Sequence, residues 1–138
     1  MANALFDSAR ASFLGGTPDI DYIDDNIVLV FVDHADDTPV AATDDFLDDI
    51  LSAARVATSG NFASKTGTAG VADAADITLT TVTGDPFESV VIYDNTPATD
   101  ATRNLIAFID TATGLPTTPN GADITVQWDS GANRIFKL

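Results

Sequence analysis

The sequence predicts a mainly β domain, an antiparallel β-sandwich or barrel-like fold with one or two short helices. Short runs of apolar and β-branched residues recur along the chain, separated by clusters of Gly, Pro, Asn and Asp. Of the 21 acidic residues all but Glu88 are Asp, which favours turns and caps over helix interiors. With 138 residues, of which 45% are hydrophobic, the chain is long enough for one domain with its own core.

The first expected element is a short helix over residues 2–14. Its apolar residues recur every four positions and so share one face: Leu5, Ala9 and Phe13, with Phe6 beside them. The glycine pair at 15–16 ends the helix. We therefore expect a helical arm over residues 1–16 and a single β-rich domain over residues 17–138. Because the arm has little of its own domain to cover it, we expect a partner protein to bury Leu5, Phe6 and Phe13.

The run Ile27–Val32 is unbroken, apolar and largely β-branched, which predicts a strand buried on both faces. A second short helix is expected near residues 43–52. There Thr43 supplies a capping hydroxyl, and the acid pair that follows suits the positive end of the helix dipole. Apolar pairs four residues apart would face inward, and Asp48 and Asp49 would face water.

The remainder of the chain predicts further strands, joined by turns rich in Gly, Pro and Asp, at residues 54–58, 77–82, 89–93, 105–109 and 124–128. After the turn DSGAN, residues 134–138 are expected to form a hairpin with the strand before them. Residues 59–70 are small and polar and predict no further element.

The composition excludes several classes of function. The net charge is −15, and the basic residues are scattered singly along the sequence, which argues against binding to DNA, RNA or anionic lipid. No apolar run approaches the roughly 18 residues of a membrane span, and the N-terminus has no signal-peptide pattern. The absence of cysteine excludes disulfides and thiolate metal sites.

The acids of DIDYIDDNIVLVFVDHADD, residues 19–37, suggest calcium, which prefers several oxygen ligands. The spacing does not match an EF-hand, because Asp24 stands where a glycine is needed and Val30 where a glutamate is needed. Solvated acids at the ends of a strand are the favoured interpretation. A weak surface calcium site near residues 19–25 stays open as an alternative.

No catalytic, cofactor or metal site is predicted. His34 is the single histidine, and a turn histidine made more basic by its acidic neighbours is favoured over a general base. No G-x-S-x-G or phosphate-binding glycine motif is present, and the paired aspartates are explained by capping and solvent exposure. We therefore expect a protein that is not an enzyme.

Three stretches of the chain are similar to a family of small structural proteins of tailed bacteriophages: ANALFDSARASFLGG, ATDDFLDDILSAARVATSG and FIDTATGLPTTPNGADITVQWDSGANRIFKL. The resemblance implies a virion protein, made in the host cytoplasm, and brings no catalytic residues. Within the virion, we expect a capsid decoration (cement) protein on the capsid exterior.

A decoration protein would bind the major capsid protein and stabilise the head, because a ligand that prefers the assembled lattice stabilises it. A homo-oligomer is expected, with a trimer favoured. The alternative within the virion is a tail tube, tail tip or fibre, or head-tail joining protein. An alternative of another class is a calcium-dependent binding module or an enzyme using residues 19–37.

Overall fold

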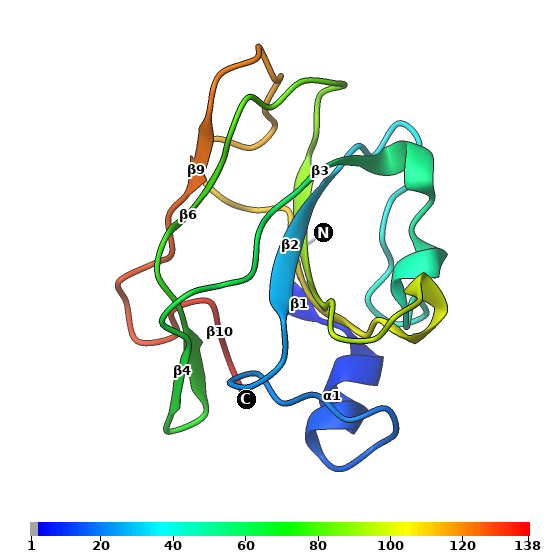
Figure 1. Ribbon diagram of the computed structural model, residues 1–138, viewed down its shortest axis with the longest axis vertical. Coiled ribbons are helices and arrows are strands. Elements are labelled where there is room, and N and C mark those ends of the chain that lie inside the picture. The colour runs from blue at the N-terminus through cyan, green and yellow to red at the C-terminus, as the bar shows by residue number, and fades with distance from the viewer. Residues whose placement is uncertain (1–2) are drawn as a thin grey trace.

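The computed structural model describes residues 3–138, and its main element is an antiparallel sheet of five strands (Figure 1). In spatial order these strands are β1 (Ala4–Leu5), β8 (Leu105–Ile109), β7 (Ser89–Asp94), β2 (Ile27–Val32) and β3 (Arg55–Thr58). All six residues of β2 and all six of β7 are buried, so both faces of the sheet are covered at these two strands.

A second layer of two small antiparallel sheets lies against one face of the central sheet. One sheet pairs β6 (Ile77–Leu79) with β9 (Ile124–Val126). The other is ordered β10 (Phe136–Lys137), β5 (Val71–Asp73) and β4 (Thr66–Thr68). Figure 1 places β6, β9, β10 and β4 to one side of β2. The prediction of a mainly β, sandwich-like domain is confirmed.

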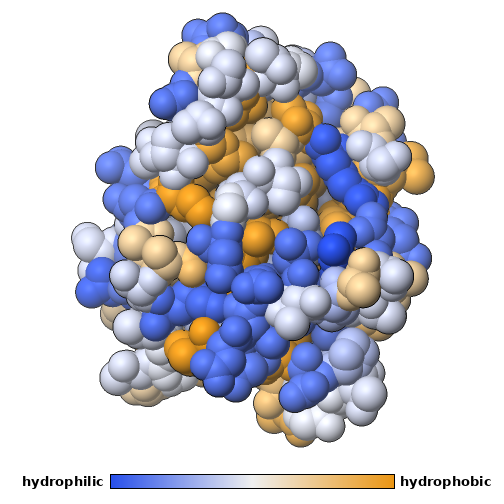
Figure 2. Space-filling view, in the orientation of Figure 1, coloured by the Kyte–Doolittle hydropathy of each residue, from blue (hydrophilic) through white to orange (hydrophobic). Residues whose placement is uncertain are grey.

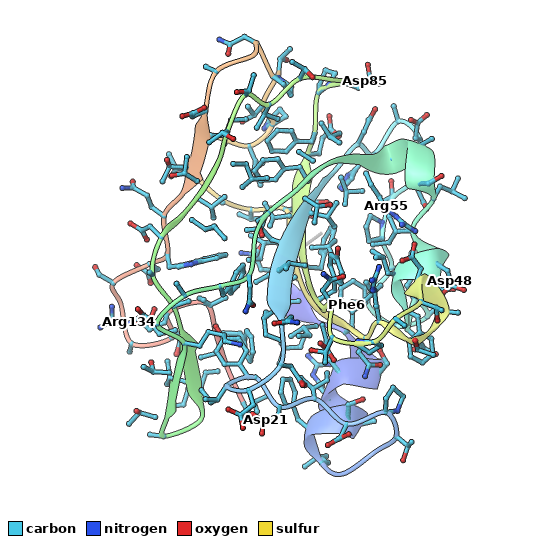
Figure 3. The ribbon with its side chains drawn as sticks, viewed as in Figure 1. Phe6, Asp21, Asp48, Arg55, Asp85 and Arg134 are labelled. Carbon is cyan, nitrogen blue, oxygen red and sulfur yellow. The ribbon has the colours of Figure 1, made fainter. Side chains whose placement is uncertain are left out.

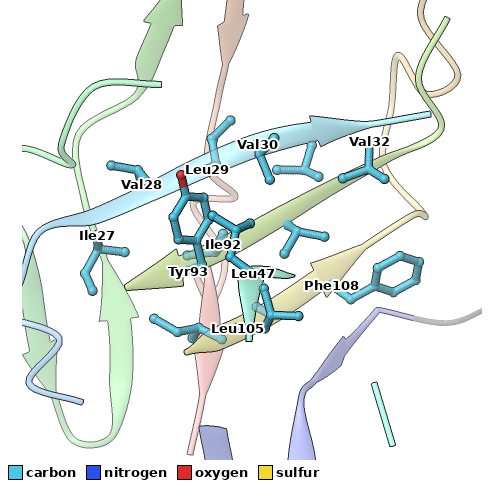
Figure 4. Packing of buried hydrophobic residues seen from close by; sticks show 14 of the residues in the cluster. Ile27, Val28, Leu29, Val30, Val32, Leu47, Ile92, Tyr93, Leu105 and Phe108 are labelled. Atoms are coloured by element: carbon cyan, nitrogen blue, oxygen red, sulfur yellow. The ribbon is translucent and has the colours of Figure 1, made fainter. Parts of the chain in front are cut away.

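The opposite face of the central sheet is covered by residues 33–54, which we call the loop layer; Figure 1 shows it in cyan beyond β2 and β3. It contains two 3-10 turns, η1 (Leu47–Asp49) and η2 (Ser52–Ala54), and packs beside a third, η3 (Asp100–Thr102). Leu47, Ile50 and Ala54 are at most 3% exposed. Figure 4 shows Leu47 beside Leu105 and Tyr93 of the sheet.

The predicted N-terminal helix is shorter than expected, and it does not form an arm outside the domain. Ala4 and Leu5 pair with Phe108 and Ala107 as the edge strand β1, and only then does α1 (Asp7–Phe13) begin. Gly15, at φ 94°, ends the helix as expected, and the N–H of Gly16 bonds the carbonyl of Ala11 at 2.8 Å. Residues 1 and 2 of the predicted arm and helix lie outside the described residues.

The second predicted helix, near residues 43–52, is replaced by the 3-10 turns of the loop layer. Aspartate side chains take up the backbone N–H groups that would start a helix. The Asp49 carboxylate accepts the N–H groups of Asp45 and Phe46 at 2.7 and 3.0 Å, and Asp44 accepts that of Val40 at 2.7 Å. Such short-range bonds compete with helix formation, so Asp49 holds a turn and does not simply face water.

Two predictions about the C-terminal half need correction. The C-terminal strand β10 pairs with β5 and not with β9, whose partner is β6. Trp128 ends that ladder by donating its N–H to Asp76 at 3.0 Å. The hairpin of β4 and β5 was not predicted, since the residues of β4 are small and exposed and β5 has only three residues.

The excess of Asp over Glu has a structural explanation. Backbone N–H groups in turns bond to short carboxylates close by in the chain. Asp21 accepts from Ile23 and Asp24, Asp33 from Ala35, and Asp94 from Thr96, at distances of 2.7 to 3.1 Å. A carboxylate on a one-carbon stem reaches these positions readily.

In residues 3–138, no helix has the length and apolar composition to cross a bilayer.

Candidate functional site

The second layer does not close over the whole face of the central sheet, and a cleft of about 940 Å³ opens between the two. Cross-strand register places Leu5, Ala107 and Ile109 on the sheet face that lines it. The facing wall comes from β9 and the C-terminal residues: Ile124, Val126, Trp128, Ile135 and Phe136. Most of these side chains are only partly buried, so the cleft exposes apolar surface.

Aromatic contacts hold the cleft walls in place. Phe31 and Phe87 stack at its base with ring centroids 4.1 Å apart and an interplanar angle of 1°. Trp128 packs against Phe62 at 5.3 Å and donates its indole N–H to the carbonyl of Ala75 at 3.2 Å. These ring contacts and the indole hydrogen bond stabilise the walls on either side of the cleft.

The C-terminal wall is also fixed by aromatic contacts. Phe136 meets Phe13 of α1 at 6.0 Å and Tyr22 at 5.6 Å. Burial, together with nearby Asp73, raises the pKa of Tyr22 above its usual range, so the phenol stays protonated and donates to the carbonyl of Asp73 at 3.2 Å. Strand β10 and helix α1 therefore lie together at one end of the cleft.

The charges around the cleft differ from those of the rest of the chain. Its lining contains three of the six basic residues, Arg10, Arg134 and Lys137, but only one of the 21 acidic residues, Asp129. Arg10 pairs with Asp7 at 2.7 Å and Arg134 with Asp73 at 3.7 Å, and all four side chains are at least 30% exposed. The cleft thus combines an apolar interior with a rim whose lining has more basic than acidic side chains, although two of the three bases are paired with aspartates.

The other three basic residues serve the fold. Arg55 donates to the carbonyls of Leu47 and Ile50 at 2.6 to 3.0 Å and to Asp100 at 2.6 Å. Arg103 binds the same carboxylate at 2.8 Å and the carbonyl of Pro97 at 3.0 Å. Lys65 donates to the carbonyl of Asp25. These side chains have their partners within the chain.

His34 and Ser89 lie at the spacing of a catalytic His–Ser dyad, but the Ser89 hydroxyl is not accessible to solvent. Its Nε2 lies 2.8 Å from the Oγ of Ser89, and its ring stacks on Phe108 with centroids 6.0 Å apart. Ser89 is fully buried at the start of β7, so no substrate can reach its hydroxyl. The geometry supports a structural hydrogen bond that joins the loop layer to the sheet.

The acids of residues 19–37 do not gather into one group. Asp21 and Asp25 are used locally, since Asp25 accepts the N–H of Asp21 at 2.7 Å. Among residues 3–138, one carboxylate trio has ligand atoms within 4.8 Å of one another: Asp33, Asp36 and Asp85. Asp85 comes from a distant turn, so the sequence alone did not indicate it, and exposed acidic groups of this kind are common without a metal.

A second, smaller hollow of about 310 Å³ lies between the edge strands β3 and β6. Figure 2 shows hydrophobic residues at its base in the upper half of the view. Gly84, at φ 121°, lies close to the side chain of Val56, one of the lining residues. Its lining carries no charged residue and indicates no particular ligand.

The three residues predicted to bind a partner lie in different environments. Phe6 is fully buried in this chain's own core, so the expectation that it awaits a partner is wrong (Figure 3). Phe13 is partly buried against Phe136. Leu5 is partly buried and lines the cleft. The exposed apolar residue of this segment is Leu14, at 90%.

The sequence did not predict that Arg10, Arg134 and Lys137 lie together, because they are isolated along the chain. Their clustering depends on the contact between α1 and β10, which are more than 120 positions apart.

No protein-family model matches the sequence, and no curated protein matches it.

Proposed function

We propose that this chain is a bacteriophage virion structural protein, a capsid decoration protein that binds the outside of the shell and stabilises the head. The observation that carries the proposal is the open apolar cleft, because a domain of this size gains stability by covering such surface in an assembly. The resemblance of its sequence to small tailed-phage structural proteins supplies the kind of assembly.

The remaining geometry is consistent with binding rather than catalysis. The Ser89 hydroxyl beside His34 is inaccessible, and the acids are largely engaged with backbone N–H groups. The fold also supplies a candidate shell contact, since Leu14 projects from the end of α1 with 90% of its surface exposed. This residue takes the place of Phe6 in the predicted N-terminal docking of the major capsid protein.

The test is addition of the purified protein to expanded capsids that lack it. We expect saturable binding at hundreds of sites and a higher melting temperature of the shell. Copy number in virions, measured by quantitative mass spectrometry, separates the alternatives: tens of copies confined to the tail would replace decoration by a tail or joining protein.

A point substitution is required to locate the shell contact. Deleting residues 1–16 would remove β1 from the central sheet and Phe6 from the core, and so would unfold the protein. Leu14→Asp leaves the core intact and is expected to weaken binding to the shell. Asp19→Lys, also on an exposed residue, serves as the control; equal binding by the wild type and Leu14→Asp would rule out this contact.

A further inference from the structure

We infer that the cleft binds a second copy of this chain, which inserts the acidic, apolar ridge of its loop layer in a head-to-tail contact. This inference rests on the proposed function, since it names the partner that covers the cleft within the assembly. The ridge comprises Asp37, Val40, Asp44, Asp48 and Leu51.

The cleft itself selects an occupant that is both apolar and negative. Its walls expose aliphatic and aromatic side chains, and its rim carries Arg10, Arg134 and Lys137. Lys137 has no ion pair within residues 3–138, and the Arg134 contact with Asp73 is long, at 3.7 Å. An incoming carboxylate can therefore bind Lys137 and Arg134 without breaking a tight internal bridge, whereas Arg10 is already paired with Asp7 at 2.7 Å.

The ridge has the complementary chemistry. Leu51 is 57% exposed and Val40 is 42% exposed, two of the five large apolar residues that the described chain leaves in solvent. Short bonds fix the two apolar positions of the ridge, each to an aspartate: the Leu51 N–H donates to Asp37 and the Val40 N–H donates to Asp44, both at 2.7 Å. Asp48 makes no hydrogen bond or ion pair within residues 3–138, so its carboxylate is available to a partner.

The positions of cleft and ridge exclude a contact in which the same patch meets itself. Figure 3 shows Arg134 and Asp48 on opposite sides of the molecule. A ridge that enters the cleft of the next copy makes a heterologous contact, which closes into a ring or continues as a filament. The predicted trimer is one such ring. Each copy then buries one ridge and one cleft.

Electrostatics favours a second copy over nucleic acid as the occupant. A chain of net charge −15 repels a phosphate backbone, and three rim cations make few of the contacts that such binding needs. A second copy offers carboxylates at a defined place on a rigid turn, so local attraction is set against general repulsion. We therefore expect assembly to strengthen at moderate salt, as long-range repulsion is screened, and to depend on the cleft charges.

The test is the mass of the protein in solution, measured by light scattering over a range of concentration and salt. We expect a defined multiple of 14.4 kDa. Asp48→Lys and Arg134→Glu should each raise the dissociation constant roughly tenfold or more. Combining them should restore assembly, because the introduced Lys and Glu face each other at every contact. Asp19→Lys changes the net charge as Asp48→Lys does and should leave assembly unchanged.

Several results would overturn the inference. These are a monomer at every concentration and salt, an oligomer indifferent to both reversals, and a double variant as weak as the single ones. Circular dichroism spectra and melting curves identify any variant that fails to fold, and Asp48→Asn and Arg134→Gln then replace it with smaller expected losses. Capsid binding is measured separately. If the protein forms the oligomer but does not bind shells, this inference stands and the proposed function is wrong.

Discussion

The two faces of the central sheet carry similar apolar and basic residues, but these residues are buried to different extents. On the loop-layer face, Phe6, Leu47 and Ile50 are at most 3% exposed, and Arg55 is bound to carbonyls of the same layer. On the cleft face, Leu5 and Ile109 are only partly buried, and Arg134 stands at the rim. One face is completed by its own chain. The other leaves apolar and basic groups partly exposed, and this is the surface on which the proposed assembly depends.

The largest expected effect is at Phe6. Phe6→Ala removes a fully buried ring from the loop-layer face and should lower the free energy of unfolding by about 3 to 5 kcal/mol. Leu5→Ala, on the cleft face of the same segment, should cost about 1 kcal/mol because that side chain is partly exposed. Urea denaturation of the monomer at low protein concentration measures both. Similar small losses for the two variants would contradict the contrast between the faces.

The next effect compares two arginines. Arg55→Met leaves the carbonyl of Ile50 without a donor, removes one of the two donors to the carbonyl of Leu47, and breaks the ion pair with Asp100, and should cost about 2 to 4 kcal/mol. Arg134→Met removes one long, exposed ion pair and should change the stability of the monomer by less than about 0.5 kcal/mol. Denaturation under the same conditions tests the pair. A large loss for Arg134→Met would mean that the cleft rim also holds the fold.

The pH dependence should differ between two carboxylates. Hydrogen bonding from Arg55, with Arg103 also close, lowers the pKa of Asp100 below its ordinary 3.8. Its stabilisation is complete above the unfolded pKa and is lost as the pH falls through the lower folded pKa. Asp100→Asn should therefore reduce stability at pH 7 by about 1 kcal/mol, with the difference closing at acid pH. A difference independent of pH would exclude an electrostatic origin.

The pKa of Asp94 is shifted in the opposite direction to that of Asp100. It is 2% exposed, and burial raises its pKa above 3.8. The penalty is absent below the unfolded pKa, grows as the pH rises, and is complete above the folded pKa. Asp94→Asn keeps an oxygen for the Thr96 N–H at 2.8 Å and should raise stability at pH 7 by less than about 1 kcal/mol, with no gain at acid pH. Melting curves across pH would expose a gain of the wrong sign.

The smallest effect tests whether the loop-layer side satisfies all of its own charges. Asp33, Asp36 and Asp85 lie close together, so with a chelator present Asp85→Asn should relieve repulsion and raise stability by roughly 0.5 kcal/mol or less. Thermal melting with and without added calcium measures this effect. A stabilisation by calcium that Asp85→Asn abolishes would instead favour the calcium-dependent alternative and move its site from residues 19–25 to this trio.

The principal strands were predictable because their signals are local. Ile27–Val32 is apolar at every position, and a six-residue run of this kind fits a strand covered on both faces, as found for β2. The strand candidates at residues 89–93 and 105–109 became β7 and β8 within a residue. The helix expected near residue 43 failed because its aspartates bond nearby N–H groups and form turns, a choice that propensity and capping patterns do not resolve.

The candidate site was predictable only in part. Leu5 was identified as a residue that partners would cover, and it lines the cleft. Phe6 could not be separated from it by sequence, because adjacent residues are both apolar and only strand pairing sends one toward the core. The Asp33, Asp36 and Asp85 trio and the Ser89 partner of His34 both join residues about 50 positions apart, so neither produces a local pattern.

The sequence by itself determined a cysteine-free, acidic β domain with a central apolar strand, since composition and strand patterns depend on near neighbours. Only the tertiary structure decided which basic and acidic side chains lie together on the surface. The Phe13 contact with Phe136 and the pairing of β10 with β5 bring Arg10, Arg134 and Lys137 to one cleft. Long-range packing thus turns scattered charges into a surface, because electrostatic complementarity depends on distance in space and not along the chain.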